Sequence, residues 1–251
     1  MAGVDGHVAL VTGAGRGIGK ATTELLLQRG ARVMAVSRSE NELTTLGTDY
    51  LVADLSTADG CARAVDETQG RLGPIEVLVC NHGVGSAHER VLWEQDPETW
   101  AQAMRVNLDG PFHLTRAILA GMVEVGYGRM VFTSSTAGRI AEQAGSAYNA
   151  SKHGLLGLMR SVAQDGGAFG VTANAVLPGW VRTEMAERSA RAESEASGKT
   201  VEQVWEERDA LYPPNRVVTP IEVAHVIAFL ASEESRGMSG QAITVALGAE
   251  V

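Results

Sequence analysis

The sequence predicts an α/β fold in which a doubly wound, seven-stranded parallel sheet is flanked by helices. Two observations lead to this prediction. Short apolar runs alternate with helical patterns along the whole chain, which is typical of a parallel sheet covered on both faces. The 251 residues suit one full core, and no repeat or low-complexity linker marks a boundary. We therefore expect a single domain over residues 1–251.

The apolar runs predict strands, and the segments between them predict helices. The strands are expected at 8–11, 31–36, 49–53, 76–80, 129–133, 171–176 and 242–246, and prominent helical patterns at 20–29, 98–122 and 147–163. Runs this short and apolar are typical of strands buried on both faces. Right-handed crossovers would bring the carboxyl ends of the strands to one edge of the sheet, where ligands bind in such folds.

A glycine-rich loop follows the first strand. It reads Thr12-Gly13-Ala14-Gly15-Arg16-Gly17-Ile18-Gly19 and leads into the first helix. Glycines let the backbone approach a pyrophosphate, and the helix N-terminus supplies N–H groups and the positive end of a dipole. The spacing Gly-x-x-x-Gly-x-Gly differs from the commoner Gly-x-Gly-x-x-Gly, but strand, loop and helix together predict a dinucleotide site on a Rossmann fold.

The end of the second strand carries Ser37 and Arg38. An acidic residue there would accept hydrogen bonds from the ribose 2′-hydroxyl and select NAD. A hydroxyl followed by a guanidinium suits a 2′-phosphate instead, and Arg16 in the glycine loop could reach the same phosphate. We expect NADP(H) to be favoured, with NAD(H) as the alternative if Arg38 only caps a solvated loop.

Tyr148, Lys152 and Ser135 form the strongest candidate for chemistry. Positions four apart share a helix face, so the Lys152 ammonium can lie beside the Tyr148 phenol and favour phenolate. Ser135, thirteen residues before the tyrosine, can orient a substrate oxygen against that phenol. The alternative is an ordinary surface pair. Arginines outnumber lysines eighteen to three, so a lysine at this position points to proton transfer.

With these motifs in place, the chain resembles the short-chain dehydrogenase/reductase family over nearly all its length. The resemblance implies catalytic roles for Asn107, Ser135, Tyr148 and Lys152, the Asn107 carbonyl holding a water in a proton relay through Lys152. It also implies that the cofactor is held by Gly13, Gly15, Arg16, Gly17, Ile18, Gly19, Ser37, Arg38, Asp54, Leu55, Asn81, Gly83, Tyr148, Lys152, Pro178, Gly179, Val181 and Thr183. Within that set Asp54 would contact adenine, Asn81 and Gly83 its ribose, and the segment from Pro178 to Thr183 the nicotinamide.

His82 departs from the family pattern. The usual Asn-Asn-Ala-Gly is Cys80-Asn81-His82-Gly83 here, so a histidine stands where a small residue is common. We expect its side chain to point to solvent or to bond locally, with a substrate or cofactor contact as the alternative.

Composition excludes several classes of function. The net charge of −9 comes without a basic stripe, which argues against nucleic acid. No apolar run approaches the ~20 residues of a membrane span, and no secretory signal is visible. Two cysteines and six histidines show neither a disulfide framework nor metal-ligand spacing, so we expect a cytoplasmic protein without a metal site.

A polar segment at 184–215 follows Thr183. Its Glu, Arg, Ala and Ser with scattered apolar residues predict two helices forming a lid over the substrate, or else a solvated helical pair. Arg182, Arg188 and Arg191 could bind a carboxylate or phosphopantetheine there, or only pair with Glu184 and Glu187.

Family likeness suggests that the helices at 98–122 and 147–163 pack against the same helices of another subunit, so we expect a homotetramer or a homodimer.

The expected reaction is hydride transfer between a nicotinamide cofactor and a ketone or secondary alcohol, with Tyr148 as general acid and base. An acyl thioester or polyketide-like ketone is one substrate class. The alternatives are an NAD-dependent dehydrogenase of a small hydroxy acid such as 3-hydroxybutyrate, and a catalytically silent NADP-sensing protein.

Overall fold

The computed structural model describes residues 3–86 and 90–249 and contains a seven-stranded sheet in the order β3-β2-β1-β4-β5-β6-β7. The strands are β1 (Val8–Thr12), β2 (Arg32–Ser37), β3 (Asp49–Val52), β4 (Val77–Cys80), β5 (Gly128–Thr133), β6 (Val171–Pro178) and β7 (Ala242–Val245). All neighbouring strands are parallel. The doubly wound sheet predicted from the apolar runs is confirmed.

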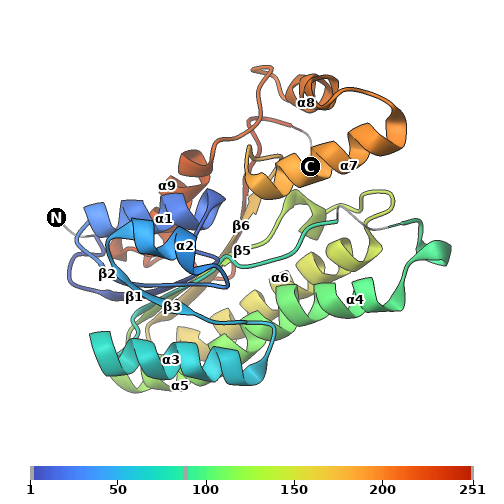
Figure 1. Ribbon diagram of the computed structural model, residues 1–251. Coiled ribbons are helices and arrows are strands. Elements are labelled where there is room, and N and C mark those ends of the chain that lie inside the picture. Colours follow the sequence, from blue (N-terminus) through green and yellow to red (C-terminus); the bar gives the residue numbers. More distant parts are fainter. Residues whose placement is uncertain (1–2, 87–89, 250–251) are drawn as a thin grey trace.

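Helices cover both faces of this sheet (Figure 1). They are α1 (Gly17–Gln28), α2 (Glu40–Leu43), α3 (Ala58–Leu72), α4 (Pro97–Met104), α5 (Gly110–Val125), α6 (Ser146–Gly167), α7 (Glu184–Ser197), α8 (Val201–Ala210) and α9 (Pro220–Leu230). Helices α1 and α9 pack together on one face, and α3, α5 and α6 lie on the other (Figure 1). The two layers leave the carboxyl edge of the sheet open to the lid helices α7 and α8.

The core divides into two layers because successive side chains of a strand point to opposite faces. In β1, Val8 and Leu10 belong to the cluster under α3, α5 and α6, whereas Ala9 and Val11 belong to the cluster under α1 and α9. All four side chains are buried. Burial on both faces is the reason why the strand reads as an unbroken apolar run.

The single helix expected at 98–122 is wrong in one respect. A π-helical turn over Arg105–Asp109 separates α4 from α5. In a regular helix the carbonyl of Asn107 would accept a hydrogen bond from the N–H of residue 111, but Pro111 has no N–H. Gly110 also lies close to the Leu55 carbonyl and the His82 ring, an approach that only a residue without a Cβ allows. Asn107 lies within this interrupted turn and is buried.

The two helices expected in the segment 184–215 are present as α7 and α8, and they have a core of their own (Figure 1). The Arg208 guanidinium lies 3.7 Å from the ring centre of Trp180 and 5.1 Å from that of Trp205. It donates to the Ala186 carbonyl at 3.0 Å and to the Glu193 carboxylate at 2.8 Å. This buried arginine joins both lid helices to the segment that follows β6.

Candidate active site

A cavity of about 970 Å³ lies at the carboxyl edge of the sheet, where the strand order reverses between β1 and β4. Ligands of doubly wound sheets bind at this point. Of the residues that the sequence assigned to catalysis or to the cofactor, those in its wall are Gly13, Gly15, Arg16, Gly17, Ile18, Ser37, Arg38, Asp54, Leu55, Asn81, Gly83, Ser135, Tyr148, Lys152, Pro178, Gly179, Val181 and Thr183. Gly19 and Asn107 are buried behind that wall.

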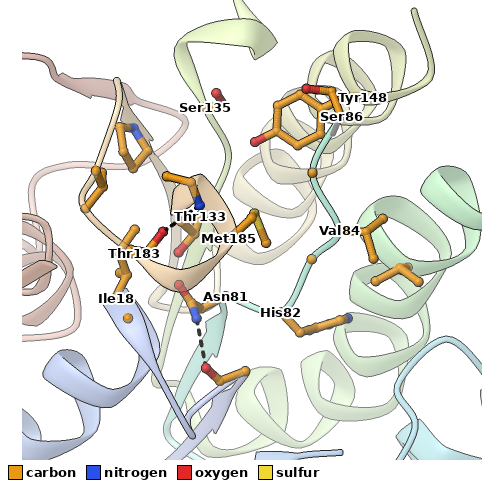
Figure 2. A pocket seen from close by; sticks show the side chains of 18 of the residues that line it. Ile18, Asn81, His82, Val84, Ser86, Thr133, Ser135, Tyr148, Thr183 and Met185 are labelled. Atoms are coloured by element: carbon orange, nitrogen blue, oxygen red, sulfur yellow. Dashed lines mark hydrogen bonds between the residues drawn. The ribbon is translucent and has the colours of Figure 1, made fainter. Parts of the chain in front are cut away.

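The glycine loop forms one end of the cavity and is shaped for a ligand to approach its backbone. Gly13 and Gly17 have φ values of 63° and 54°, in the left-handed region that favours glycine. A Cβ on Gly19 would collide with the Gly13 carbonyl, which accepts a hydrogen bond from the Asn81 amide at 3.3 Å (Figure 2). Arg16 makes no side-chain cap on α1, so the first-turn N–H groups stay available to an anion.

Gly19→Ala is expected to lower the melting temperature and to weaken dinucleotide binding at least ~tenfold, because the added methyl group displaces the loop. Thermal unfolding and titration calorimetry measure the two effects. Gly70→Ala in α3 is the matched control, since a Cβ there meets nothing within 4 Å. It should be neutral or slightly stabilising. Unchanged dinucleotide affinity in the Gly19 variant would contradict the prediction.

At the adenosine end of the cavity, the residues predicted to bind a 2′-phosphate differ in their contacts with the rest of the chain. The Ser37 hydroxyl bonds to the Ser39 backbone at 3.2 Å, and Arg38 is exposed. Hydrogen bonds from Ser56 hold the pKa of Asp54 below its usual value, and the positive charge of the nearby Arg38 guanidinium lowers it further. Arg16 is paired with two carboxylates, Glu184 at 2.7 Å and Glu42 at 3.4 Å. Arg16 is therefore already neutralised by contacts with carboxylates of the chain.

The catalytic candidates meet at the other end of the cavity. Figure 2 shows the Tyr148 ring and Ser135 on the same side of the opening. The Ser135 hydroxyl accepts a hydrogen bond from the Ala137 N–H at 3.2 Å and keeps its own proton for a ligand. The preceding residue, Ser134, also carries a hydroxyl, but it is buried and donates to the Lys152 carbonyl at 3.1 Å, which ties it to α6. The geometry therefore favours Ser135 over Ser134 as the hydroxyl that a ligand can meet.

Lys152 is buried beside Tyr148 on the same face of α6. Its Nζ lies 5.6 Å from the centre of the Tyr148 ring and donates to the Thr133 carbonyl at 2.9 Å. Burial disfavours the ammonium and lowers the pKa of Lys152 to about 8. An ammonium buried in this way exerts its charge on the phenol with less screening from water than an exposed one would.

Asn107 joins the loop after β4 to α6. Its Oδ1 accepts from the Val84 N–H at 2.8 Å, and its Nδ2 donates to the Val84 carbonyl at 3.1 Å and to the Ser151 hydroxyl at 3.0 Å. The side chain is thus fully used in holding the wall beside Lys152. Its backbone carbonyl has lost its regular helical donor because residue 111 is proline.

The segment after β6 closes the cavity near the lid. The Tyr212 hydroxyl accepts from the Trp180 N–H at 2.6 Å and lies against Gly179. Thr183 caps α7 by accepting from the Ala186 N–H at 3.3 Å, and its methyl group contacts Gly17. Trp180 and Tyr212 line the cavity and were not singled out in the sequence, because Tyr212 reaches Gly179 only through the fold of the lid.

His82 bonds locally and does not point to solvent. Its Nδ1 lies 2.8 Å from the Thr12 hydroxyl, which also donates to the Val79 carbonyl at 3.1 Å. Nε2 is buried and has no hydrogen-bond partner among the residues that the structure describes. Burial lowers the pKa of His82 to about 3, so the ring is neutral and braces the loop after β4 against β1.

The described part of the chain contains no group of three His, Cys, Asp or Glu side chains placed to hold a metal ion. None of the helices in residues 3–86 and 90–249 is long and apolar enough to cross a membrane.

Comparisons with known proteins agree with this geometry. A family model described as enoyl-(acyl carrier protein) reductase matches residues 13–250. The 3-oxoacyl-(acyl-carrier-protein) reductase FabG of Vibrio cholerae is 32% identical over 249 residues, covering 96% of each chain. D-beta-hydroxybutyrate dehydrogenase of Cupriavidus necator is 33% identical over 247 residues, covering 94% of this chain and 95% of the relative. The crystal structure of an actinorhodin polyketide ketoreductase with NADPH superposes with a TM-score of 0.93 at 33% identity, covering 99% of this chain and 98% of that chain.

The fold and the matches define an oxidoreductase that uses a nicotinamide cofactor. The chain belongs to the short-chain dehydrogenase/reductase family.

Proposed function

We propose that the protein reduces a ketone on an acyl thioester or a polyketide-like chain, with NADPH as the favoured cofactor. The observation that carries this proposal is that Ser135, Tyr148 and Lys152 line the same cavity as the glycine loop. The exposed Arg38 at the end of β2 supports the phosphorylated cofactor. Similarity to a ketoreductase crystallised with NADPH and to FabG supports both cofactor and substrate class.

The residues present fit the cofactor. Backbone N–H groups of the glycine loop and of the first turn of α1 would hold the pyrophosphate, and Asp54, Asn81 and Gly83 line the adenosine end. The segment from Pro178 to Thr183, fixed by Tyr212, would hold the nicotinamide. When bound, NADPH supplies the hydride that reduces the carbonyl carbon.

The side chains at the catalytic end of the cavity transfer the proton to the substrate. Tyr148 donates its phenolic proton to the substrate oxygen, and Ser135 donates a hydrogen bond that stabilises the developing negative charge. The Lys152 ammonium stabilises the phenolate left behind. The Asn107 carbonyl, without its regular helical donor, accepts from a water that returns protons towards Lys152. Oxidation of the alcohol runs through the same groups in reverse.

The charges around the cavity favour an uncharged ketone over a small hydroxy acid. Each arginine considered for carboxylate binding is paired within the chain: Arg188 with Glu184 at 2.7 Å, Arg191 with Glu187 at 3.6 Å, and Arg182 with Asp209 at 3.6 Å. Glu142 also lines the cavity and would repel a carboxylate. Similarity to D-beta-hydroxybutyrate dehydrogenase keeps the hydroxy acid as the second candidate.

A turnover screen tests the proposal. 3-Oxoacyl thioesters, simple ketones and 3-hydroxybutyrate would be offered with NADPH or with the oxidised cofactors, and the absorbance of the reduced nicotinamide followed. We expect the fastest turnover with a 3-oxoacyl thioester and NADPH. Faster NAD-dependent oxidation of 3-hydroxybutyrate would instead establish the second candidate. Tight NADPH binding without any turnover would identify a sensing protein.

Ser135→Ala is expected to lower kcat about tenfold or more without changing cofactor affinity, because the oxygen loses a hydrogen-bond donor as its charge develops. Ser134→Ala is the matched control, since that hydroxyl is tied to the Lys152 carbonyl. It should cost about 1 kcal/mol of stability and little of kcat. Steady-state kinetics and thermal unfolding separate the two variants. The reverse order of the kinetic losses would transfer the role to Ser134.

We propose a homotetramer, or a homodimer, formed through α4, α5 and α6. Trp100 on α4 and Phe112 on α5 support this, because 40% and 45% of these large side chains are exposed. Light scattering at micromolar concentration tests it, and a monomer would contradict it.

We also propose a cytoplasmic location, supported by the two buried cysteines, Cys61 and Cys80, which are not joined by a disulfide.

A further inference from the structure

We infer that Glu42 limits how strongly the site discriminates in favour of the phosphorylated cofactor. Its carboxylate lies at the wall where the adenosine ribose would be held, and it favours a ribose with free hydroxyls over one with a 2′-phosphate. This inference rests on the proposed function, because it concerns the dinucleotide end of that same cavity.

Glu42 is brought to the glycine loop by the short helix α2, which follows β2. Its Oε2 lies 2.6 Å and its Cβ 2.8 Å from the position that a Cβ on Gly15 would take, and the Ser37 hydroxyl lies 3.2 Å from the same position. Glu42 and Ser37 both line the cavity. The carboxylate therefore meets the glycine loop at the same place as a residue expected to receive the phosphate.

Glu42 also acts on the second cation of this region. The Arg16 guanidinium lies 3.4 Å from the Glu42 carboxylate and 2.7 Å from that of Glu184 at the start of α7. Two carboxylates thus share one guanidinium. A phosphate that pairs with Arg16 must compete with both of them, whereas Arg38 is exposed and close enough to lower the pKa of Asp54.

The sign of the effect follows from elementary electrostatics. A phosphate monoester carries a charge of about −1.5 to −2 near neutral pH and is repelled by a carboxylate a few ångströms away. A ribose hydroxyl donates a hydrogen bond, and the same carboxylate can accept it. Glu42 therefore weakens the binding of NADP(H), whereas it leaves the binding of NAD(H) unchanged or strengthens it. Removing its charge raises selectivity for NADP(H).

The experiment compares the dissociation constants of NADP⁺ and NAD⁺ by titration calorimetry without substrate. In Glu42→Gln the ratio of the NAD⁺ constant to the NADP⁺ constant is expected to rise about tenfold, which corresponds to about 1.4 kcal/mol. Glu40→Gln is the matched control. It makes the same charge change on the same helix, and its carboxylate accepts from the Tyr50 hydroxyl at 3.3 Å, outside the cavity wall. That variant should leave the ratio within twofold.

Glu184→Gln separates the direct effect of Glu42 from competition for Arg16. It removes the closer partner of Arg16 but leaves the Glu42 carboxylate against Gly15, so its ratio should rise less than that of Glu42→Gln. A ratio within twofold of wild type in Glu42→Gln, or an equal rise in Glu40→Gln, would overturn the inference and leave the proposed function standing. A wild-type protein that binds neither dinucleotide would overturn both.

Discussion

Tyr148→Phe is expected to lower kcat/KM for the ketone by about a hundred- to ten-thousand-fold, while the dissociation constant of NADPH changes less than about twofold. The substitution removes the proton that Tyr148 donates to the substrate oxygen. It keeps the ring that packs beside Lys152. Steady-state kinetics and calorimetric titration of the cofactor measure the two quantities on the same preparation.

Tyr50→Phe is the control for loss of a tyrosine hydroxyl. The hydroxyl of Tyr50, on the outer strand β3, donates to the exposed Glu40 side chain outside the cavity wall, and its loss should leave kcat/KM within twofold. Substantial turnover in Tyr148→Phe would show that another group delivers the proton. The oxidative reaction should be as strongly impaired, since the same oxygen accepts the proton in that direction.

Lys152→Met is expected to abolish most activity and at the same time to stabilise the folded protein near pH 7. Activity falls about a hundredfold or more because the phenolate loses its cation. Stability rises because the fall in the pKa of Lys152 from 10.5 to about 8 corresponds to a cost of about 3 kcal/mol for keeping the ammonium buried. The lost hydrogen bond to the Thr133 carbonyl offsets about 1 kcal/mol of this gain.

The stability difference between Lys152→Met and wild type should depend on pH. Between pH 8 and 10.5 the unfolded chain keeps the Lys152 proton and the folded protein does not, so the stability of wild type rises with pH across this window. The advantage of Lys152→Met should therefore be full below pH 8 and disappear towards pH 10.5. Denaturant titrations at several pH values measure it. Lys20→Met, which removes a half-exposed lysine from α1, is the control for the loss of a lysine side chain. A Lys152→Met protein that is less stable at neutral pH would contradict the argument.

Much of the fold and of the site could be predicted from the sequence because the signals are local. The apolar runs at 8–11 and 171–176 predict strands buried on both faces, and the structure has β1 and β6 there. The four-residue spacing of Tyr148 and Lys152 fixes a shared helix face wherever that helix packs. The two helices after Thr183 followed from the composition of the segment 184–215.

The π-helical turn and the orientation of the His82 ring could not be predicted from the hydrophobic periodicity. Pro111 indicates that the helix cannot be regular around Asn107, yet the apolar pattern runs through 98–122 without a break. His82 differs from the family pattern, but the sequence does not say that its ring turns to the Thr12 hydroxyl.

By itself, the sequence determined the sheet, the glycine turn and the face of α6 that carries Tyr148 and Lys152, because these depend on backbone conformation and on spacing along one element. Only the tertiary structure decided that Glu42 lies against Gly15, that Tyr212 fixes Gly179, and that Arg208 lies between two indole rings. Those contacts join segments far apart in the chain, and their distances depend on how the layers pack. The same packing decides which cofactor and which substrate the common catalytic groups receive.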